Sequence, residues 1–421
     1  MSEMYFLTNR NPIPDNDNPT DFGPNFNLKG APYLRVGKAI LADPKPGDEW
    51  APADLAIDAL TVYPDMTPDP KAPKGYRYGS EDMIDAIKKR VFDNGDPPNA
   101  IADVLLFVHG FDTKFTEALQ LPMQMTLNLE RARQKLLTGA PAGAPSLASS
   151  RPFVLVVFTW PSDGEMVPEV SYWSDRTDAK TSDQALARVF LKLRDFLDQQ
   201  YQQRLKTVNP GGTVRGARDA LRAGDLDCGV RLHLVAQSMG NFVLRNGLQA
   251  FRNDPSVIGH PLPRMFDQIF LTGADDNDDA FSDDDMLRPL PDLAKQVTVY
   301  CNPGDKALFT SMSTKHLGKR LGQNGPKEVI DVANLAAVNI EDVLPASGDD
   351  FTGHYYYRLN HEVHCDMLYL MAGTPAAQAP GRRMVENNRY RLGYTVFKPA
   401  ANQQPSQSSG AGFDPRSLQG P

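Results

Sequence analysis

Ser238 stands in a segment, residues 231–244 (RLHLVAQSMGNFVL), that combines three features. An apolar run comes first, the serine follows between Ala236 and Gly240, and a helical pattern comes last. A strand that leads into small-x-Ser-x-Gly and then into a helix is the sequence form of a nucleophile elbow. The turn is strained, so small flanking residues avoid a backbone clash, and the helix N-terminus stabilises nearby negative charge. The segment predicts a nucleophilic serine; the alternative is an ordinary turn whose serine caps the helix.

Two backbone amides are candidates for the oxyanion hole that acyl transfer requires. Such a hole usually takes one N–H from the residue after the serine and one from the loop after an earlier strand. Met239 follows Ser238, and Phe111 follows the apolar run LLFV and the pair His109-Gly110. We therefore expect the amides of Met239 and Phe111 to stabilise the oxyanion. The residues expected to line the substrate pocket are His109, Gly110, Trp160 and Gln237.

The acid of a hydrolase triad should follow the nucleophile in the chain and precede the histidine. Asp305 comes after the apolar run VTVYC, at a Pro-Gly turn two predicted strands beyond the nucleophile. A loop at that place would face the serine, so Asp305 is the first candidate. Asp275 and Asp276, which follow the run QIFL, remain alternatives.

The base is expected to be a histidine late in the chain. His354 follows Gly353 in a predicted loop, where it is presented without steric hindrance, and histidine titrates near neutral pH. His361 and His364 are rival candidates.

Two short motifs suggest metal sites and depart from the required pattern. The acidic run at residues 275–279 resembles the start of a calcium loop, but Ala280 stands at the glycine position and Met286 at the glutamate position. The segment HEVHC at residues 361–365 lacks histidines four residues apart, which a zincin helix needs. The prediction is therefore a site without a metal or other cofactor.

Alternating strand and helix patterns predict the elements that position these residues. Apolar runs with little polar alternation are typical of a parallel sheet covered on both faces. Such runs, or shorter strand-like pieces, occur at residues 4–7, 101–108, 151–158, 231–235, 268–271, 297–301 and 328–332. Helical patterns occur at residues 80–92, 116–136, 182–197 and 240–251, and Pro122 should kink or restart the second of these helices. The sequence predicts an α/β-hydrolase fold, a mostly parallel doubly wound sheet with helices on both faces.

Composition restricts the classes of partner and compartment. The chain carries 44 basic and 52 acidic side chains for a net charge of −8, so phosphate backbones repel it and nucleic acid is not an expected partner. The three cysteines are widely spaced, which suits a reducing compartment. No apolar stretch approaches the roughly 18 residues of a membrane helix, and the N-terminus does not resemble a signal peptide. We expect a cytoplasmic protein without a membrane span; the oligomeric state is not predicted.

The chain is expected to divide into three parts. Residues 1–99 form an N-terminal extension with short strands that pack on the core, and residues 100–375 form the catalytic domain. Residues 376–421 form a C-terminal segment that is polar and rich in Gly, Ser and Pro from residue 400, a composition typical of disorder.

Several of these segments together resemble a bacterial α/β-hydrolase family of unassigned function. They are YFLTNR at residues 5–10, HGF at 109–111, FTWPS at 158–162, QSMGN at 237–241, GDKAL at 304–308 and GHYY at 353–356. The resemblance implies an esterase-like fold with Ser238, Asp305 and His354 as its triad. Gln237 departs from the histidine that is usual before the serine; it is not a triad member, so the departure concerns the pocket and not the chemistry. The family provides no substrate.

The resulting hypothesis is a serine hydrolase that cleaves a small-molecule carboxylic ester or thioester through an acyl-enzyme. A different hypothesis is a non-catalytic binding or scaffold protein on a hydrolase fold, since fold does not imply function. The distance between His354 and Ser238 discriminates between them. A third hypothesis, a metal-dependent hydrolase using His361, His364 and the acidic run, predicts loss of activity on chelation.

Overall fold

The computed structural model describes residues 2–42, 51–92, 100–139, 143–162, 168–208, 229–284, 286–313, 318–328, 332–345, 350 and 352–394. In this part of the chain, eleven strands form one sheet in the order β14-β15-β13-β12-β11-β10-β8-β9-β1-β4-β5. From β15 to β1 every neighbouring pair is parallel, while β14, β4 and β5 add antiparallel strands at the two edges. The predicted mostly parallel sheet is therefore confirmed.

The strands of this sheet are β1 (Ser2–Thr8), β4 (Arg35–Leu41), β5 (Ile57–Val62), β8 (Asp103–Val108), β9 (Phe153–Thr159), β10 (Leu232–Gln237), β11 (Phe266–Thr272), β12 (Ala294–Cys301), β13 (Leu335–Asn339), β14 (Arg382–Glu386) and β15 (Arg389–Leu392). Two small ribbons pair β2 (Arg10–Ile13) with β3 (Asp21–Phe26) and β6 (Met66–Pro68) with β7 (Tyr76–Tyr78). All residues of β8 and β10 are buried, because helices cover both faces of the sheet there.

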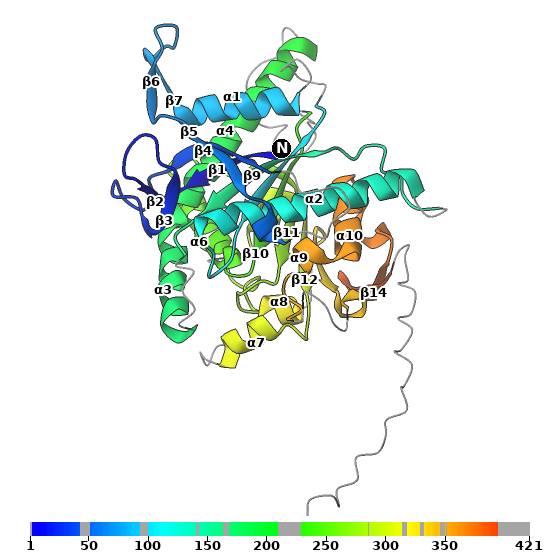
Figure 1. Cartoon of the computed structure of the whole chain (residues 1–421). Coiled ribbons are helices and arrows are strands. Elements are labelled where there is room, and N and C mark those ends of the chain that lie inside the picture. Colours follow the sequence, from blue (N-terminus) through cyan, green and yellow to red (C-terminus); the bar gives the residue numbers. More distant parts are fainter. Residues whose placement is uncertain are drawn as a thin grey trace, which may run out of the picture.

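The helices are α1 (Gly79–Val91), α2 (Phe115–Gly139), α3 (Pro168–Thr181), α4 (Asp183–Val208), α6 (Gly240–Arg252), α7 (Lys306–Ser313), α8 (Leu321–Asn324), α9 (Tyr356–Leu359) and α10 (His361–Met371). Short 3-10 helices span Pro52–Asp54, Leu290–Leu293, Glu341–Val343 and Ala376–Gln378. Apolar side chains of α1, α3, α4 and α6 form one core cluster with the sheet, and those of α2, α9 and α10 form a second. The two clusters are the two faces of the sheet, and Figure 1 shows α2 crossing the nearer face.

One predicted helix differs in detail from the structure, and two other predictions fall wholly or mostly outside the described residues. The helix around Pro122 neither ends nor restarts there, because α2 continues through this residue to Gly139. Of the strand predicted at residues 328–332, residues 329–331 lie outside the described part, and the next described strand is β13, which begins at Leu335. The tail from residue 400 also lies outside the described residues.

The N-terminal segment contributes strands to the main sheet. β1 pairs in parallel with β9, and β4 and β5 continue the sheet beyond it. Because β1 is parallel to its neighbour, its carboxyl end lies at the same sheet edge as the carboxyl ends of β9, β8 and β10. The turn after Thr8 is therefore brought toward the turns that carry the predicted site residues.

The strand order reverses direction next to Ser238. β8 lies between β9 and β10, so the chain passes from β8 to β9 on one side and then returns across β8 to β10 on the other. In open α/β sheets, ligands bind outside the carboxyl ends of the strands at such a reversal. The carboxyl ends of β8 and β10 carry Gly110 and Ser238 respectively.

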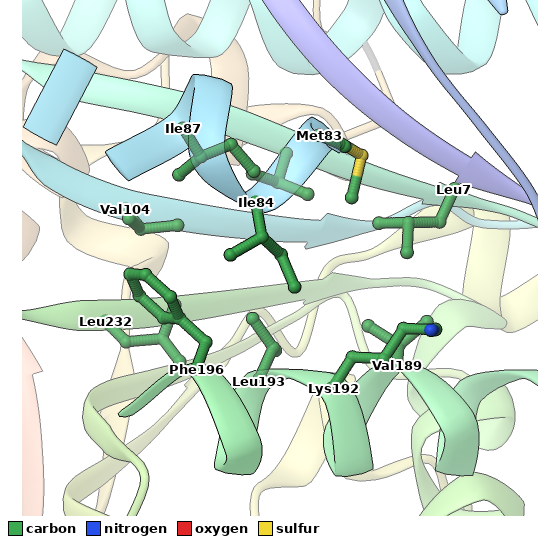
Figure 2. Close-up of a pocket in the computed structure, with 11 residues that line it drawn as sticks. Leu7, Met83, Ile84, Ile87, Val104, Val189, Lys192, Leu193, Phe196 and Leu232 are labelled. Atoms are coloured by element: carbon green, nitrogen blue, oxygen red, sulfur yellow. The ribbon is translucent and has the colours of Figure 1, made fainter. Parts of the chain in front are cut away.

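An apolar cavity of about 30 Å³ lies elsewhere, between α1, α4 and the sheet. Figure 2 shows Met83, Ile84 and Ile87 of α1 facing Leu193 and Phe196 of α4. This lining offers almost no partner to water or to a polar substrate, so we interpret the cavity as a packing gap in the core. Among the helices described, none is long and apolar enough to cross a membrane.

Candidate active site

Ser238 occupies a strained turn between β10 and α6. Its φ angle is 51°, in the left-handed region that residues other than glycine rarely adopt. The turn is held on both sides: the Ser238 N–H donates to the Thr272 carbonyl at 2.9 Å, and the Asp275 N–H donates to the Ser238 carbonyl at 3.1 Å. Such a conformation costs on the order of 1–3 kcal/mol and persists only where contacts with the surrounding structure fix it.

Close backbone contacts explain the small residues around this serine. A Cβ atom on Gly240 would lie 2.5 Å from the carbonyl oxygens of both Val108 and His109, at the end of β8. A Cβ atom on Gly110 would lie 2.8 Å from the Cβ of Ser238. Glycine at these two positions therefore allows the Ser238 turn and the turn after β8 to pack directly against each other.

The structure brings His354 and Asp305 together. His354 Nδ1 lies 2.7 Å from Asp305 Oδ2, and both residues are buried. The other oxygen of this carboxylate, Oδ1, accepts a hydrogen bond from the Leu308 N–H at 2.9 Å, so Asp305 also caps the start of α7. Because the carboxylate accepts, Nδ1 carries the hydrogen and Nε2 of the neutral ring keeps its lone pair.

Burial by itself lowers the pKa of His354, but the charge of Asp305 and its hydrogen bond outweigh that effect and raise the pKa. Asp275 and Asp350 act in the same direction. The imidazolium form is therefore stabilised in a buried place, as a residue that takes up a proton during a reaction requires.

The loop that presents His354 is held by two residues that we did not predict. Asp350 accepts hydrogen bonds from the N–H groups of His354 at 3.0 Å and Tyr355 at 2.8 Å. Asn302, at the end of β12, donates to the Gly353 carbonyl at 2.8 Å and accepts from the Gly304 N–H at 3.0 Å. The sequence carried a signal for Asn302, which precedes Pro303 and Gly304, since Asn next to Pro or Gly commonly organises turns. Asp350, between Asp349 and Phe351, carried no comparable signal.

The backbone after β11 leaves space for the imidazole. Gly273 has a φ angle of 48°, and a Cβ atom there would lie 2.7 Å from Cε1 of His354. The ring consequently lies against the main chain between the ends of β10 and β12. This position directs Nε2 toward the residues at the end of β10.

The residue that Nε2 contacts is Gln237. The distance between His354 Nε2 and the side-chain nitrogen of Gln237 is 3.1 Å, and Gln237 is buried. Within the described residues, no hydrogen bond joins Ser238 to His354. His354 thus lies beside the Ser238 turn, and its Nε2 contacts the residue that precedes the serine.

The amides of Phe111 and Met239 are the predicted donors of the oxyanion hole. Neither N–H has a hydrogen-bond acceptor among the residues that the structure describes. Met239 lies at the start of α6, where the helix dipole favours negative charge. Phe111 lies in the turn after β8, which packs on Ser238 through Gly110.

A buried polar network supports the Phe111 turn. Asp175 of α3 accepts from the Asp112 N–H at 3.2 Å and from the Ser162 hydroxyl at 2.5 Å. The Ser162 hydroxyl in turn accepts from the Thr113 N–H at 3.1 Å. These residues were not predicted as part of the site, apart from Ser162 as a member of a motif.

Arg10 connects this network to the N-terminal strand. Its guanidinium donates to the Thr113 carbonyl at 2.6 Å, to Thr159 Oγ1 at 2.8 Å and to the Ser162 carbonyl at 3.2 Å. Arg10 is almost fully buried. One side chain from the start of β2 therefore contacts the turns after both β8 and β9.

His109 and Trp160, predicted to line the pocket, are both buried and stack on each other at a centroid distance of 5.1 Å. The Trp160 N–H donates to His109 Nε2 at 3.1 Å, and its indole N–H donates to the His109 carbonyl at 3.0 Å. Burial, assisted by the charge of Arg10, lowers the pKa of His109 to about 3, so this ring is neutral. In the structure the two rings form the packing beneath the Phe111 turn and present almost no surface to solvent.

Asp275 and Asp276, the alternative acids, bind arginines instead of His354. Asp275 accepts from the Tyr172 hydroxyl at 2.8 Å and lies 3.1 Å from Nε of the buried Arg320. Asp276 accepts from Arg245 at 2.7 Å, although burial raises its pKa.

The rival histidines lie in α10. His364 contacts the Tyr357 carbonyl at 2.9 Å, and burial lowers its pKa to about 4. His361 lies 3.7 Å from the sulfur of Cys365. In the described part of the chain, no group of three or more His, Cys, Asp or Glu residues is arranged to hold a metal ion.

A parallel sheet with helices on both faces and a strained serine turn at a strand reversal defines the α/β-hydrolase class. The chain belongs to the family described as alpha/beta hydrolase of unknown function (DUF900), which matches residues 89–204 and 226–371, more than half of the chain. The predicted family resemblance is therefore confirmed. No curated protein and no solved structure gives a significant match.

Proposed function

We propose that the protein is a serine hydrolase that cleaves a carboxylic ester or thioester through an acyl-enzyme. The observation that carries the proposal is the combination of Ser238 in a left-handed turn with a buried His354–Asp305 pair beside it. A strained serine turn, a histidine and a carboxylate on the far nitrogen of that histidine are the parts of a nucleophilic triad.

In the proposed reaction, His354 Nε2 takes the proton of the Ser238 hydroxyl while Oγ forms a bond to the substrate carbonyl carbon. The amides of Phe111 and Met239 donate to the resulting oxyanion. His354 then gives the proton to the leaving alcohol or thiol as the carbon–oxygen or carbon–sulfur bond breaks. Water attacks the acyl-enzyme by the same route and restores Ser238. Asp305 holds the imidazole in the required tautomer and stabilises its charged form.

A fluorophosphonate probe tests this proposal, because it labels serines that are activated as nucleophiles. The wild type should be labelled, and Ser238→Ala should not. The matched control is Ser149→Ala, which changes an exposed serine whose hydroxyl contacts the Ala372 carbonyl. It should be labelled like the wild type. Labelling that persists in a folded Ser238→Ala protein would overturn the assignment of the nucleophile. A panel of aryl esters and thioesters then identifies the acyl group.

A non-catalytic binding protein is the second candidate, and one observation favours it. The proton-accepting nitrogen of His354 contacts Gln237, with no hydrogen bond from Ser238 in the part of the chain described. A folded wild type that resists the probe over the whole range from acid to alkaline pH would favour this candidate over a hydrolase.

A further inference from the structure

The side chain of Gln237 contacts the ring nitrogen of His354 that the proposed reaction uses as the base. Its side-chain nitrogen lies 3.1 Å from Nε2 of His354. Since Nδ1 donates to Asp305, Nε2 of the neutral ring is an acceptor, and the amide of Gln237 must be the donor. The Gln237 side chain also fills the space that Gly110 leaves, because a Cβ atom on Gly110 would lie 2.4 Å from Gln237 Oε1.

An imidazole nitrogen has one lone pair, which lies in the plane of the ring. It accepts one well-aligned hydrogen bond, so the Gln237 amide and the Ser238 hydroxyl compete for the same position on Nε2. While the amide occupies it, the histidine cannot take the proton of the serine. We propose that Gln237 is a positioning residue that holds His354 in a resting arrangement and must release Nε2 before Ser238 can be activated.

This inference rests on the proposed function, since release matters only if Ser238 is a nucleophile. It concerns the regulation of that site by a residue of the chain itself. The packing of Gln237 against Gly110 gives the release a physical trigger. A substrate that approaches the Phe111 amide passes this turn, and displacement of the Gln237 side chain there would free Nε2 at the moment of binding.

The charged groups that act most strongly on His354 are Asp305 after β12, Asp275 after β11 and Asp350 of its own loop. The ring also lies edge-on to Tyr355 and against the backbone of Gly273. All three carboxylates favour the imidazolium. A fourth carboxylate at position 237 would add to their effect, whereas an apolar side chain would change only the competition for Nε2.

Two variants separate this role from simple packing. Gln237→Met keeps the length of the side chain and removes the donor, and we expect fluorophosphonate labelling of Ser238 to become about two- to tenfold faster, the effect of one ordinary hydrogen bond. Gln237→Glu places a carboxylate beside Nε2, and we expect the midpoint of the labelling rate against pH to move to higher pH. Gln296→Met is the matched control, because Gln296 lies in β12 and its side chain contacts the Val297 carbonyl; its rate and midpoint should equal those of the wild type.

The outcomes distinguish the two proposals. A labelled wild type with an unchanged or slower Gln237→Met, or an unmoved midpoint in Gln237→Glu, overturns the role of Gln237 and leaves the serine hydrolase standing. Labelling that appears only in Gln237→Met supports both proposals and shows that the resting arrangement is fully populated. If no folded variant is labelled at any pH, the proposed function fails and the role of Gln237 fails with it.

Discussion

The contacts of the His354 ring determine its charge. Its Nδ1 faces a buried carboxylate, its Nε2 faces a neutral amide, and its Cε1 lies against the backbone of Gly273. Burial alone lowers the pKa of this ring and would keep it neutral; Asp305 reverses that direction. A base that must become charged in a buried site depends on such a partner, so the two residues should be tested as a pair.

Asp305→Asn should reduce the rate of Ser238 labelling by about 10²- to 10⁴-fold, because the amide favours the wrong tautomer and leaves the imidazolium unsupported. The carboxylate raises the pKa of His354. Its loss should therefore move the midpoint of the pH dependence of the remaining labelling rate to lower pH. Labelling rates measured across the pH range check both effects. A midpoint that stays in place would show that Asp305 does not control the charge of this ring.

The same pair should affect stability in a pH-dependent way. The folded-state pKa of His354 is raised above the value of about 6.5 in the unfolded chain. Its contribution to stability is therefore fully present below that pH and is lost as pH rises through the folded-state value. Urea unfolding of the wild type and Asp305→Asn should show a larger difference at about pH 5.5 than at about pH 9. An equal difference at both pH values would contradict this linkage.

At the scale of elements, the junction of β8, β10 and α6 sets the geometry of the Ser238 turn. Gly110 and Gly240 let two turns approach each other closely, and Ser238 adopts a left-handed conformation between them. The first turn of α6 follows this serine directly. The arrangement depends on backbone proximity more than on any side chain of the turn.

Gly240→Ala should lower the free energy of unfolding by about 1–3 kcal/mol, because the added methyl group would overlap the carbonyl oxygens of Val108 and His109. Urea unfolding measures this loss. Gly139→Ala is the matched control, since a Cβ atom on Gly139 would meet nothing within 4 Å. Equal stability of the two variants would show that the turn after β8 can move away at little cost.

At the scale of the whole molecule, the N-terminal segment contributes a strand to the main sheet and a side chain to the surroundings of the candidate site. The family match begins at residue 89, yet β1 is an inner strand of the sheet and Arg10 contacts the turns after β8 and β9. The segment from residue 2 to Arg10 therefore supports the loop that carries the Phe111 amide. Its removal would change the sheet and the turn after β8 together.

Arg10→Met should destabilise the fold by roughly 2–4 kcal/mol, because several buried acceptors lose a charged donor. It should also slow the labelling of Ser238 in molecules that remain folded, since the Thr113 carbonyl that follows Phe111 loses its contact. Arg188→Met is the control, because Arg188 is exposed and donates to the Pro32 carbonyl. Thermal unfolding and labelling rates measure the two effects. Normal labelling in folded Arg10→Met would show that the Phe111 turn is held without this side chain.

The sequence by itself determined the local elements and their types. Apolar runs such as residues 101–108 and 151–158 predicted strands β8 and β9, because a strand buried on both faces has no polar alternation. Small residues around Ser238 predicted a tight turn before a helix, since only small side chains fit there. These predictions hold because steric limits and burial act within a few residues of the chain.

Tertiary structure alone decided which of these elements are neighbours. The sequence left Asp305, Asp275 and Asp276 as competing acids; only the strand order shows that the turn after β12 meets His354 while Asp275 meets Arg320. It also left open what faces Nε2 of His354, and the structure places Gln237 there. The physical reason is that a contact between residues more than 40 positions apart depends on sheet pairing and on side-chain direction at the strand ends, which no local pattern contains.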